Sequence, residues 1–285
     1  MSERVAILTP DAAGPWYSSR WRDVLGRMAA PLEAAGLEVE GRSWTDGEDL
    51  ADFPLVLPLL VWGYHVSDRW NDQVASWAAR SIRLQNPPDV LRWNADKLYL
   101  QRLAESGARI VPTRFIDRVS EDALAEAAGA FGADRLVAKP RISAGAFQTI
   151  RWSPGAPLGD APTSEAMIQP YLPSIETEGE ISLIYLGGRF SHAIRKVPQP
   201  GDFRVQPEYD GIITPHDPAP GEIAAAEAAL NAAGEDLLYA RVDLVRDLEG
   251  QPALIELELV EPDLYLGHDP QAPQRFGEAV RSALR

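Results

Sequence analysis

The chain has 285 residues, of which 45% are hydrophobic and 24% charged, a composition typical of a globular protein with a sizeable core. Its net charge of −15 argues against a nucleic-acid partner, because such an interface needs a basic surface. No apolar run reaches the roughly 18–20 residues of a membrane span. With no cysteine in the chain, disulfides and thiolate chemistry are excluded. We expect a cytoplasmic protein without a signal peptide or a membrane partner.

The first 90 or so residues alternate between expected strands and expected helices. Strand patterns cover residues 4–9, 37–42 and 55–61, and apolar residues recur at helical spacing over 19–35 and 68–82. This alternation predicts an open α/β unit built on a small parallel sheet.

A turn at residues 86–88 ends this alternation, and the rest of the chain has a different pattern. Helices are expected over 94–106, over 120–131 with Ser120 as N-cap, over 219–233 and over 273–284. Strands are expected over 111–116, 135–139, 147–152, 167–170, 180–186, 189–197, 239–245 and 253–259. Neighbouring strands joined by short turns predict antiparallel sheets, so the second half reads as α+β.

Three acidic residues near the C-terminus form the strongest chemical motif. Glu256 and Glu258 lie two apart in one expected strand and therefore share a face, and Asp243 lies in the strand before it. If these strands pair, the three carboxylates converge, and oxygen ligands of this kind suit Mg²⁺ or Mn²⁺. An equally weighted alternative is that the alternation marks the solvated face of an edge hairpin.

Only three of the 27 basic residues are lysines, namely Lys97, Lys139 and Lys196. A GC-rich genome would produce this bias by itself, but a lysine kept under such a bias also suits a phosphate oxygen better than a planar guanidinium does. Lys139 precedes a loop of small residues, 143–147, whose backbone N–H groups could approach a phosphate. The alternatives are a plain hairpin with an exposed Lys139 and a solvated Lys97.

The order of these motifs resembles that of the ATP-grasp superfamily. The matching segments are Asn94-x-x-Lys97, Val111-Pro112-Thr113, Val137-Ala138-Lys139-Pro140, Ile168-Gln169-Pro170-Tyr171, Arg241-x-Asp243 and Glu256-x-Glu258. Within the superfamily, the chain is similar to the branch of glutathione synthetase, RimK-type ligases and D-alanine–D-alanine ligase. The segments 91–97 and 256–262 are most similar to those of O-ureido-serine cyclo-ligases.

The resemblance implies an ATP-grasp fold preceded by a small pre-ATP-grasp domain. The first domain would be 1–93 and the ATP-grasp domain 94–285, with a lid over about 112–168 and a C-terminal catalytic part over about 169–285. The resemblance also implies a role for each candidate site residue. The phosphates of ATP would be bound by Lys97, Lys139, Ser143 and Gly145, adenine by Gln169, Pro170, Tyr171 and Leu172, and ribose by Glu176 or Glu180. Mg²⁺, or Mn²⁺ in its place, would be held by Asp243, Glu256 and Glu258. The catalytic group would consist of Arg204, Arg241 and Lys196.

Glu258 departs from the superfamily pattern, because an asparagine usually stands at this position. The extra negative charge is compatible with Mg²⁺ but leaves the ligand set open. The implied activity is ATP-dependent, ADP-forming ligation of a carboxylate and an amine through an acyl-phosphate, with residues 11–17 and 62–65 lining the pocket of a small amino-acid-like substrate.

Within this activity, ring closure inside one molecule is the first expectation. The alternatives are a glutathione synthetase or RimK-like peptide-bond ligase, an ATP-binding module without ligase activity and, ranked last, an acidic Ca²⁺-binding protein. A homodimer is one candidate assembly.

Overall fold

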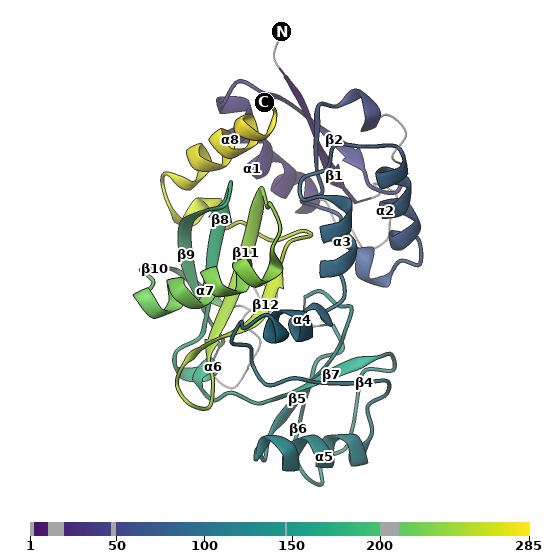
Figure 1. Cartoon of the computed structure of the whole chain (residues 1–285), viewed down its shortest axis with the longest axis vertical. Coiled ribbons are helices and arrows are strands. Elements are labelled where there is room, and N and C mark those ends of the chain that lie inside the picture. Colours follow the sequence, from purple (N-terminus) through teal and green to yellow (C-terminus); the bar gives the residue numbers. More distant parts are fainter. Residues whose placement is uncertain (1–2, 11–19, 47–49, 146, 200–210) are drawn as a thin grey trace.

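The computed structural model describes residues 3–10, 20–46, 50–145, 147–199 and 211–285, and the described strands form three sheets (Figure 1). The first sheet is parallel, and the other two are antiparallel. The α/β class with an α+β second half is therefore confirmed. In the described part of the chain, no helix combines the length and the apolar character needed to cross a bilayer.

The parallel sheet has the order β2-β1-β3 and is covered on both faces. Its strands are β1 (Arg4–Thr9), β2 (Glu38–Ser43) and β3 (Leu55–Leu57), and its helices are α1 (Arg20–Ala34) and α2 (Trp70–Ala79). Val5 and Ile7 pack in the cluster that contains Leu32 of α1, whereas Ala6 and Leu8 pack in the cluster that contains Trp77 of α2. Alternate residues of β1 thus pack into two different hydrophobic clusters, which explains why the sequence of this strand is continuously apolar.

The C-terminal helix α8 (Ala272–Ala283) returns to pack against α1 (Figure 1). A Cβ atom at Gly277 would lie 2.9 Å from the backbone oxygen of Pro31, so glycine is what permits this close approach. The last helix therefore shares a core with the first 93 residues. The division into domains 1–93 and 94–285 stays a prediction.

The second sheet has the order β4-β7-β5-β6 and lies at the opposite end of the molecule from the first (Figure 1). Its elements are β4 (Arg114–Ile116), β5 (Leu136–Pro140), β6 (Ile150–Trp152), β7 (Ala166–Pro170) and the covering helix α5 (Glu121–Phe131). The hydroxyl of Ser120 accepts a hydrogen bond from the backbone N–H of Ala123, at 3.1 Å, so the expected N-cap is confirmed.

The third sheet has the order β10-β9-β8-β11-β12 and lies between the other two (Figure 1). Its strands are β8 (Glu180–Leu186), β9 (Arg189–Val197), β10 (Ile212–His216), β11 (Tyr239–Arg246) and β12 (Pro252–Glu258). The helices α3 (Pro88–Asn94), α4 (Tyr99–Glu105), α6 (Ser174–Thr177) and α7 (Pro220–Ala233) complete this part. Three alanines of α7 (Ala226, Ala229 and Ala233) share a core with Val242 and Leu257 of the sheet.

Several expected elements are shorter in the structure than the sequence predicted. The strands expected over 111–116 and 147–152 begin at Arg114 and Ile150. The strand expected over 55–61 ends at Leu57, because Pro58 has no N–H group to continue the ladder. The helix expected over 94–106 begins only at Tyr99, as α4, and the unexpected helix α3 ends at Asn94. Between them the backbone N–H of Lys97 leaves the helical pattern and donates to the backbone oxygen of Arg141, at 3.0 Å.

Candidate active site

A cavity of about 490 Å³ lies where the three sheets meet, and residues from all three parts of the molecule line it. Most of the candidate residues proposed from the sequence lie on its wall. They are Lys97, Lys139, Ser143, Gly145, Gln169, Pro170, Leu172, Glu180, Lys196, Arg241, Asp243, Glu256 and Glu258. Residues separated by more than 100 positions in the chain therefore face a common space.

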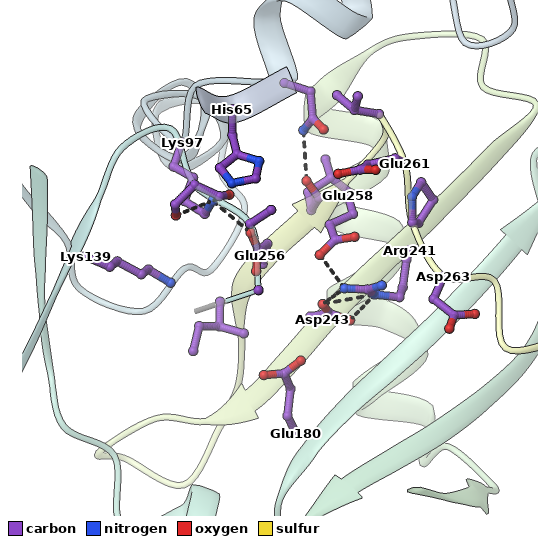
Figure 2. A pocket seen from close by; sticks show the side chains of 18 of the residues that line it. His65, Lys97, Lys139, Glu180, Arg241, Asp243, Glu256, Glu258, Glu261 and Asp263 are labelled. Atoms are coloured by element: carbon purple, nitrogen blue, oxygen red, sulfur yellow. Dashed lines mark hydrogen bonds and ion pairs between the residues drawn. The ribbon is translucent and has the colours of Figure 1, made fainter. Parts of the chain in front are cut away.

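The acidic group is formed by the hairpin of β11 and β12 (Figure 2). In the register of these strands, Asp243 stands opposite Glu256, and Arg241 stands opposite Glu258. One carboxylate oxygen from each of the three acids lies within 4.8 Å of the other two. Because Asp243 is only 1% exposed, the alternative of a solvated outer face is wrong.

Two buried cations stabilise the charge of Asp243. The guanidinium of Arg241 donates from Nε to Oδ1 of Asp243, at 3.0 Å, and from Nη2 to Oδ2, at 2.9 Å. Lys196 pairs with Glu180 and also lies 3.5 Å from Asp243. Burial opposes ionisation of Asp243, but Arg241 and Lys196 outweigh it and lower the pKa of this carboxyl to about 2.

Glu258 has the opposite character, although Arg241 also donates to it. Burial raises the pKa of Glu258 to about 7, with Glu256 and Asp243 adding to the rise and Arg241 opposing it. Glu258 is therefore less fully neutralised by its protein partners than Asp243 is. Hard oxygen donors gathered within 4.8 Å of one another suit a divalent cation such as Mg²⁺, so the residues present fit the metal that the sequence led us to expect.

Lys97 connects the acidic group to the loop that follows β5. Its Nζ lies 3.1 Å from Oε1 of Glu256 and donates to the backbone oxygen of Ser143, at 2.8 Å. Next to it, Nε of Arg141 donates to Oδ1 of Asp96, at 3.0 Å. These contacts hold the loop that carries Ser143 and Gly145 against one side of the cavity.

Lys139 extends from β5 towards the acidic group (Figure 2). Among the described residues no ion pair is recorded for it. Burial lowers the pKa of Lys139, although Glu256 opposes this effect. An amine that faces a cavity without a paired anion is suited to contact an anionic ligand.

The strand β7 and the residues after it form another wall of the cavity. Gln169, Pro170 and Leu172 line this wall, and Nε2 of Gln169 donates to the hydroxyl of Thr113, at 2.9 Å. Two predicted residues, Tyr171 and Glu176, do not line the cavity, and the hydroxyl of Tyr171 donates to Glu176. Of the two acids proposed for ribose, Glu180 alone lies on the cavity wall.

The remaining candidates belong to the substrate pocket and the catalytic group. Arg204 and residues 11–17 lie outside the described residues. Residues 62–65, which follow β3 and include part of the 3₁₀ helix η2 (Tyr64–Val66), line the cavity as expected.

Two supporting residues were missed from the sequence. Nδ2 of Asn94 donates to the backbone oxygen of Leu257, and its Oδ1 accepts from the backbone N–H of Leu259, both at 2.8 Å. The hydroxyl of Tyr99 accepts from the backbone N–H of Leu257, at 2.9 Å. Both side chains therefore hold the segment of β12 that carries the acids. Asn94 was part of an expected motif, but no spacing in the sequence indicates this contact with a strand more than 160 residues away.

Comparison with known proteins finds relatives that match over nearly the whole chain. The cycloserine biosynthesis protein DcsG of Streptomyces lavendulae is 31% identical over 288 residues, covering 90% of this chain and 94% of that protein. The crystal structure of D-cycloserine synthetase DcsG matches with a TM-score of 0.81 at 27% identity, covering 99% of this chain and all of the other. No family model matches the chain.

More distant structures have the same fold. A D-alanine–D-alanine ligase from Bacillus anthracis matches with a TM-score of 0.70 at 15% identity, over 99% of this chain and 97% of the other. The ATP-grasp ligase PsnB, in complex with a variant of its minimal precursor, Mg and ADP, matches with a TM-score of 0.67 at 15% identity, over 100% of this chain and 99% of the other. At this level of identity the similarity concerns the fold.

Proposed function

The chain belongs to the ATP-grasp ligases, and on this premise we propose that it is a cyclo-ligase that closes a ring within one small amino-acid-like substrate. As a member of this family it is an ATP-dependent enzyme that joins a carboxylate to an amine. The finer assignment is supported by the match to the crystal structure of D-cycloserine synthetase DcsG, because that match covers all of the DcsG chain. We propose O-ureido-D-serine as the substrate.

In this proposal the cavity holds ATP with Mg²⁺, or Mn²⁺ in its place. Lys97 and Lys139 contact the phosphates, and Ser143 and Gly145 cover them. Gln169, Pro170, Leu172 and the backbone at Tyr171 hold adenine, and Glu180 binds the ribose hydroxyls. Asp243, Glu256 and Glu258 hold the metal, which when bound neutralises phosphate charge and fixes the position of the phosphate oxygens.

The proposed reaction has two steps. An oxygen of the substrate carboxylate attacks the γ-phosphorus of ATP, and the bond to the bridging oxygen breaks, giving an acyl-phosphate and ADP. A nitrogen of the same substrate molecule then attacks the acyl carbon, phosphate leaves, and the nitrogen loses a proton. Arg241, Lys196 and Arg204 supply positive charge near the oxygens on which negative charge develops.

The observation that carries the proposal is the meeting of the three acids in one cavity with the amine of Lys139, which forms no ion pair with the residues that the structure describes. The test is ADP release from ATP and Mg²⁺ with O-ureido-D-serine as the single organic substrate, followed by mass spectrometry of the product. Turnover that needs a second, separate amine would contradict ring closure and favour a peptide-bond ligase.

Two substitutions test the site itself. We expect Lys139→Ala and Glu256→Ala each to lower the rate of ADP release by about 10²–10³-fold, because each removes a charge that acts in the transition state. The exposed residues Arg189 and Glu235 provide controls for the loss of one positive and one negative charge, as Arg189→Ala and Glu235→Ala. Circular dichroism checks that the variants fold. Turnover similar to wild type in both site variants would refute the assignment.

A further inference from the structure

The wall of the cavity continues past Glu258 to Glu261. Tyr64, His65 and Tyr265 line the same cavity. Figure 2 shows Glu261 beside Glu258, on the side away from Asp243 and Glu180, and shows His65 across from it. Glu261 follows β12 and received no role from its position in the sequence.

Glu261 places an acid with a free oxygen atom on the wall of the cavity. Its Oε2 atom is buried and has no hydrogen-bond partner among the residues that the structure describes. Buried polar atoms are satisfied in the great majority of folded proteins, and those that remain without a partner often belong to functional sites. Burial raises the pKa of Glu261 well above its usual range, with Glu258 adding to the rise and Arg241 opposing it.

Glu261 is separate from the candidate metal cluster. The described acids whose oxygens gather within 4.8 Å of one another are Asp243, Glu256 and Glu258, and Glu261 is outside that group. A ligand bound in the cavity can supply the missing partner. A donor with positive charge would satisfy the free oxygen and also favour the ionised carboxylate.

The chemistry of the activated substrate indicates what this donor is. The reacting carboxylate must lie next to the metal and the γ-phosphate, and thus close to Glu258. In an α-amino acid, the ammonium nitrogen is two bonds from the carboxyl carbon. The first acid beyond Glu258 on the cavity wall is therefore well placed to meet that ammonium group.

We propose that Glu261 binds the α-ammonium group of the substrate through its free Oε2 atom and thereby selects α-amino acids over acids that lack the amine. An ammonium N–H donates to the carboxylate, and no bond is made or broken in this contact. This inference rests on the proposed function, because it takes the substrate carboxylate to be activated next to Glu258.

The test combines a substitution with a change in the substrate. The probes are O-ureido-D-serine and its counterpart with a hydroxyl in place of the α-amine. We expect Glu261→Gln to raise KM for O-ureido-D-serine by about 10- to 100-fold, the range for a lost hydrogen bond to a charged group, and to leave KM for ATP unchanged. Wild type should discriminate strongly between the two probes, and Glu261→Gln should lose most of this discrimination.

The control variant is Glu235→Gln, which makes the same change on the exposed surface and should retain both KM values. An unchanged KM for the amino acid in Glu261→Gln, a fall in kcat alone, or a shift only in the Mg²⁺ requirement would each overturn the inference. Equal turnover of the two probes by wild type would overturn it as well. Failure of wild type to release ADP with any carboxylic acid would instead refute the proposed function.

Discussion

Glu258 stands opposite Arg241 in the sheet and shares one buried site with Asp243 and Glu256. Asp243 is ionised throughout the neutral range because two cations contact it, whereas the pKa of Glu258 is raised to about 7. Two carboxyl groups in one cluster thus differ in charge state because Asp243 accepts from both Nε and Nη2 of Arg241 and also lies 3.5 Å from Lys196, whereas Glu258 accepts from Nη2 of Arg241 alone. The third negative charge of the cluster is therefore the one that depends most on pH and on the metal.

The first prediction concerns Glu258 and the stability of the metal-free protein. The carboxyl has a pKa near 4.5 when unfolded and about 7 when folded, so the folded state retains a proton that the unfolded state releases. The free energy of unfolding should therefore fall as the pH rises between these two pKa values. Above pH 7 the full cost of burying the ionised carboxylate is present. We expect Glu258→Gln to raise the melting temperature in EDTA at pH 8 and to have a much smaller effect at pH 5.

Thermal denaturation at the two pH values measures this difference, and Glu235→Gln serves as the exposed control. A melting temperature of Glu258→Gln below that of wild type at pH 8 would show that its bond to Arg241 outweighs the cost of burying the charge.

At the scale of elements, β12 is held in place by side chains from the segments that precede it. Asn94, at the end of α3, bonds to Leu257 and Leu259, the residues on either side of Glu258. These two hydrogen bonds attach the end of α3 to the strand that carries the acids, and we call them the clamp.

The second prediction follows from this clamp. Asn94→Ala leaves a buried backbone oxygen and a buried N–H group without partners, which should reduce the free energy of unfolding by roughly 2–4 kcal/mol. We also expect slower ADP release, because Glu258 lies between Leu257 and Leu259, whose backbone groups would lose their hydrogen bonds to Asn94. Urea denaturation and steady-state kinetics measure the two effects. Asn71→Ala, on the exposed face of α2, should change neither, and an Asn94→Ala variant as stable as wild type would contradict the clamp.

The elements differ in how well the sequence predicted them. The strand β9 was predicted with its observed limits, because apolar residues and a Gly187-Gly188 turn define it locally. The edge strand β10 was not predicted, since it is largely exposed and contains Pro215. Contacts over long sequence distances decide such cases, and a local pattern does not contain them.

In the candidate site too, some features follow from local sequence patterns and others depend on contacts over long sequence distances. Glu256 and Glu258 could be placed on one face from their spacing alone, and the hairpin register then brought Asp243 to them. No local pattern in the sequence indicates the support from Asn94 and Tyr99 or the free oxygen of Glu261. These features depend on how separate segments pack around the cavity.

At the scale of the whole molecule, one ligand would contact residues that belong to or follow three different sheets. Lys139 lies in the second sheet, the acids lie in the third, and residues 62–65 follow the first. Nucleotide bound between these parts should therefore stabilise the fold as a unit.

The third prediction is a rise in melting temperature with ADP and Mg²⁺. At a ligand concentration 100 times Kd, binding contributes about 2.7 kcal/mol, which corresponds to a rise on the order of 5 °C. The Lys97→Ala/Lys139→Ala variant should lose most of this rise, because both amines would contact phosphate. Differential scanning fluorimetry measures the shift, with Mg²⁺ alone as control, and an unchanged melting temperature of wild type would contradict nucleotide binding at this cavity.

Lys97, Lys139 and Lys196 are the three lysines of the chain, and all of them line the cavity. Elsewhere the side-chain cations are guanidinium groups, which do not react with acylating reagents under mild conditions. Covalent labelling of side-chain amines would thus report on the occupancy of this site, and immobilisation through lysine would block it.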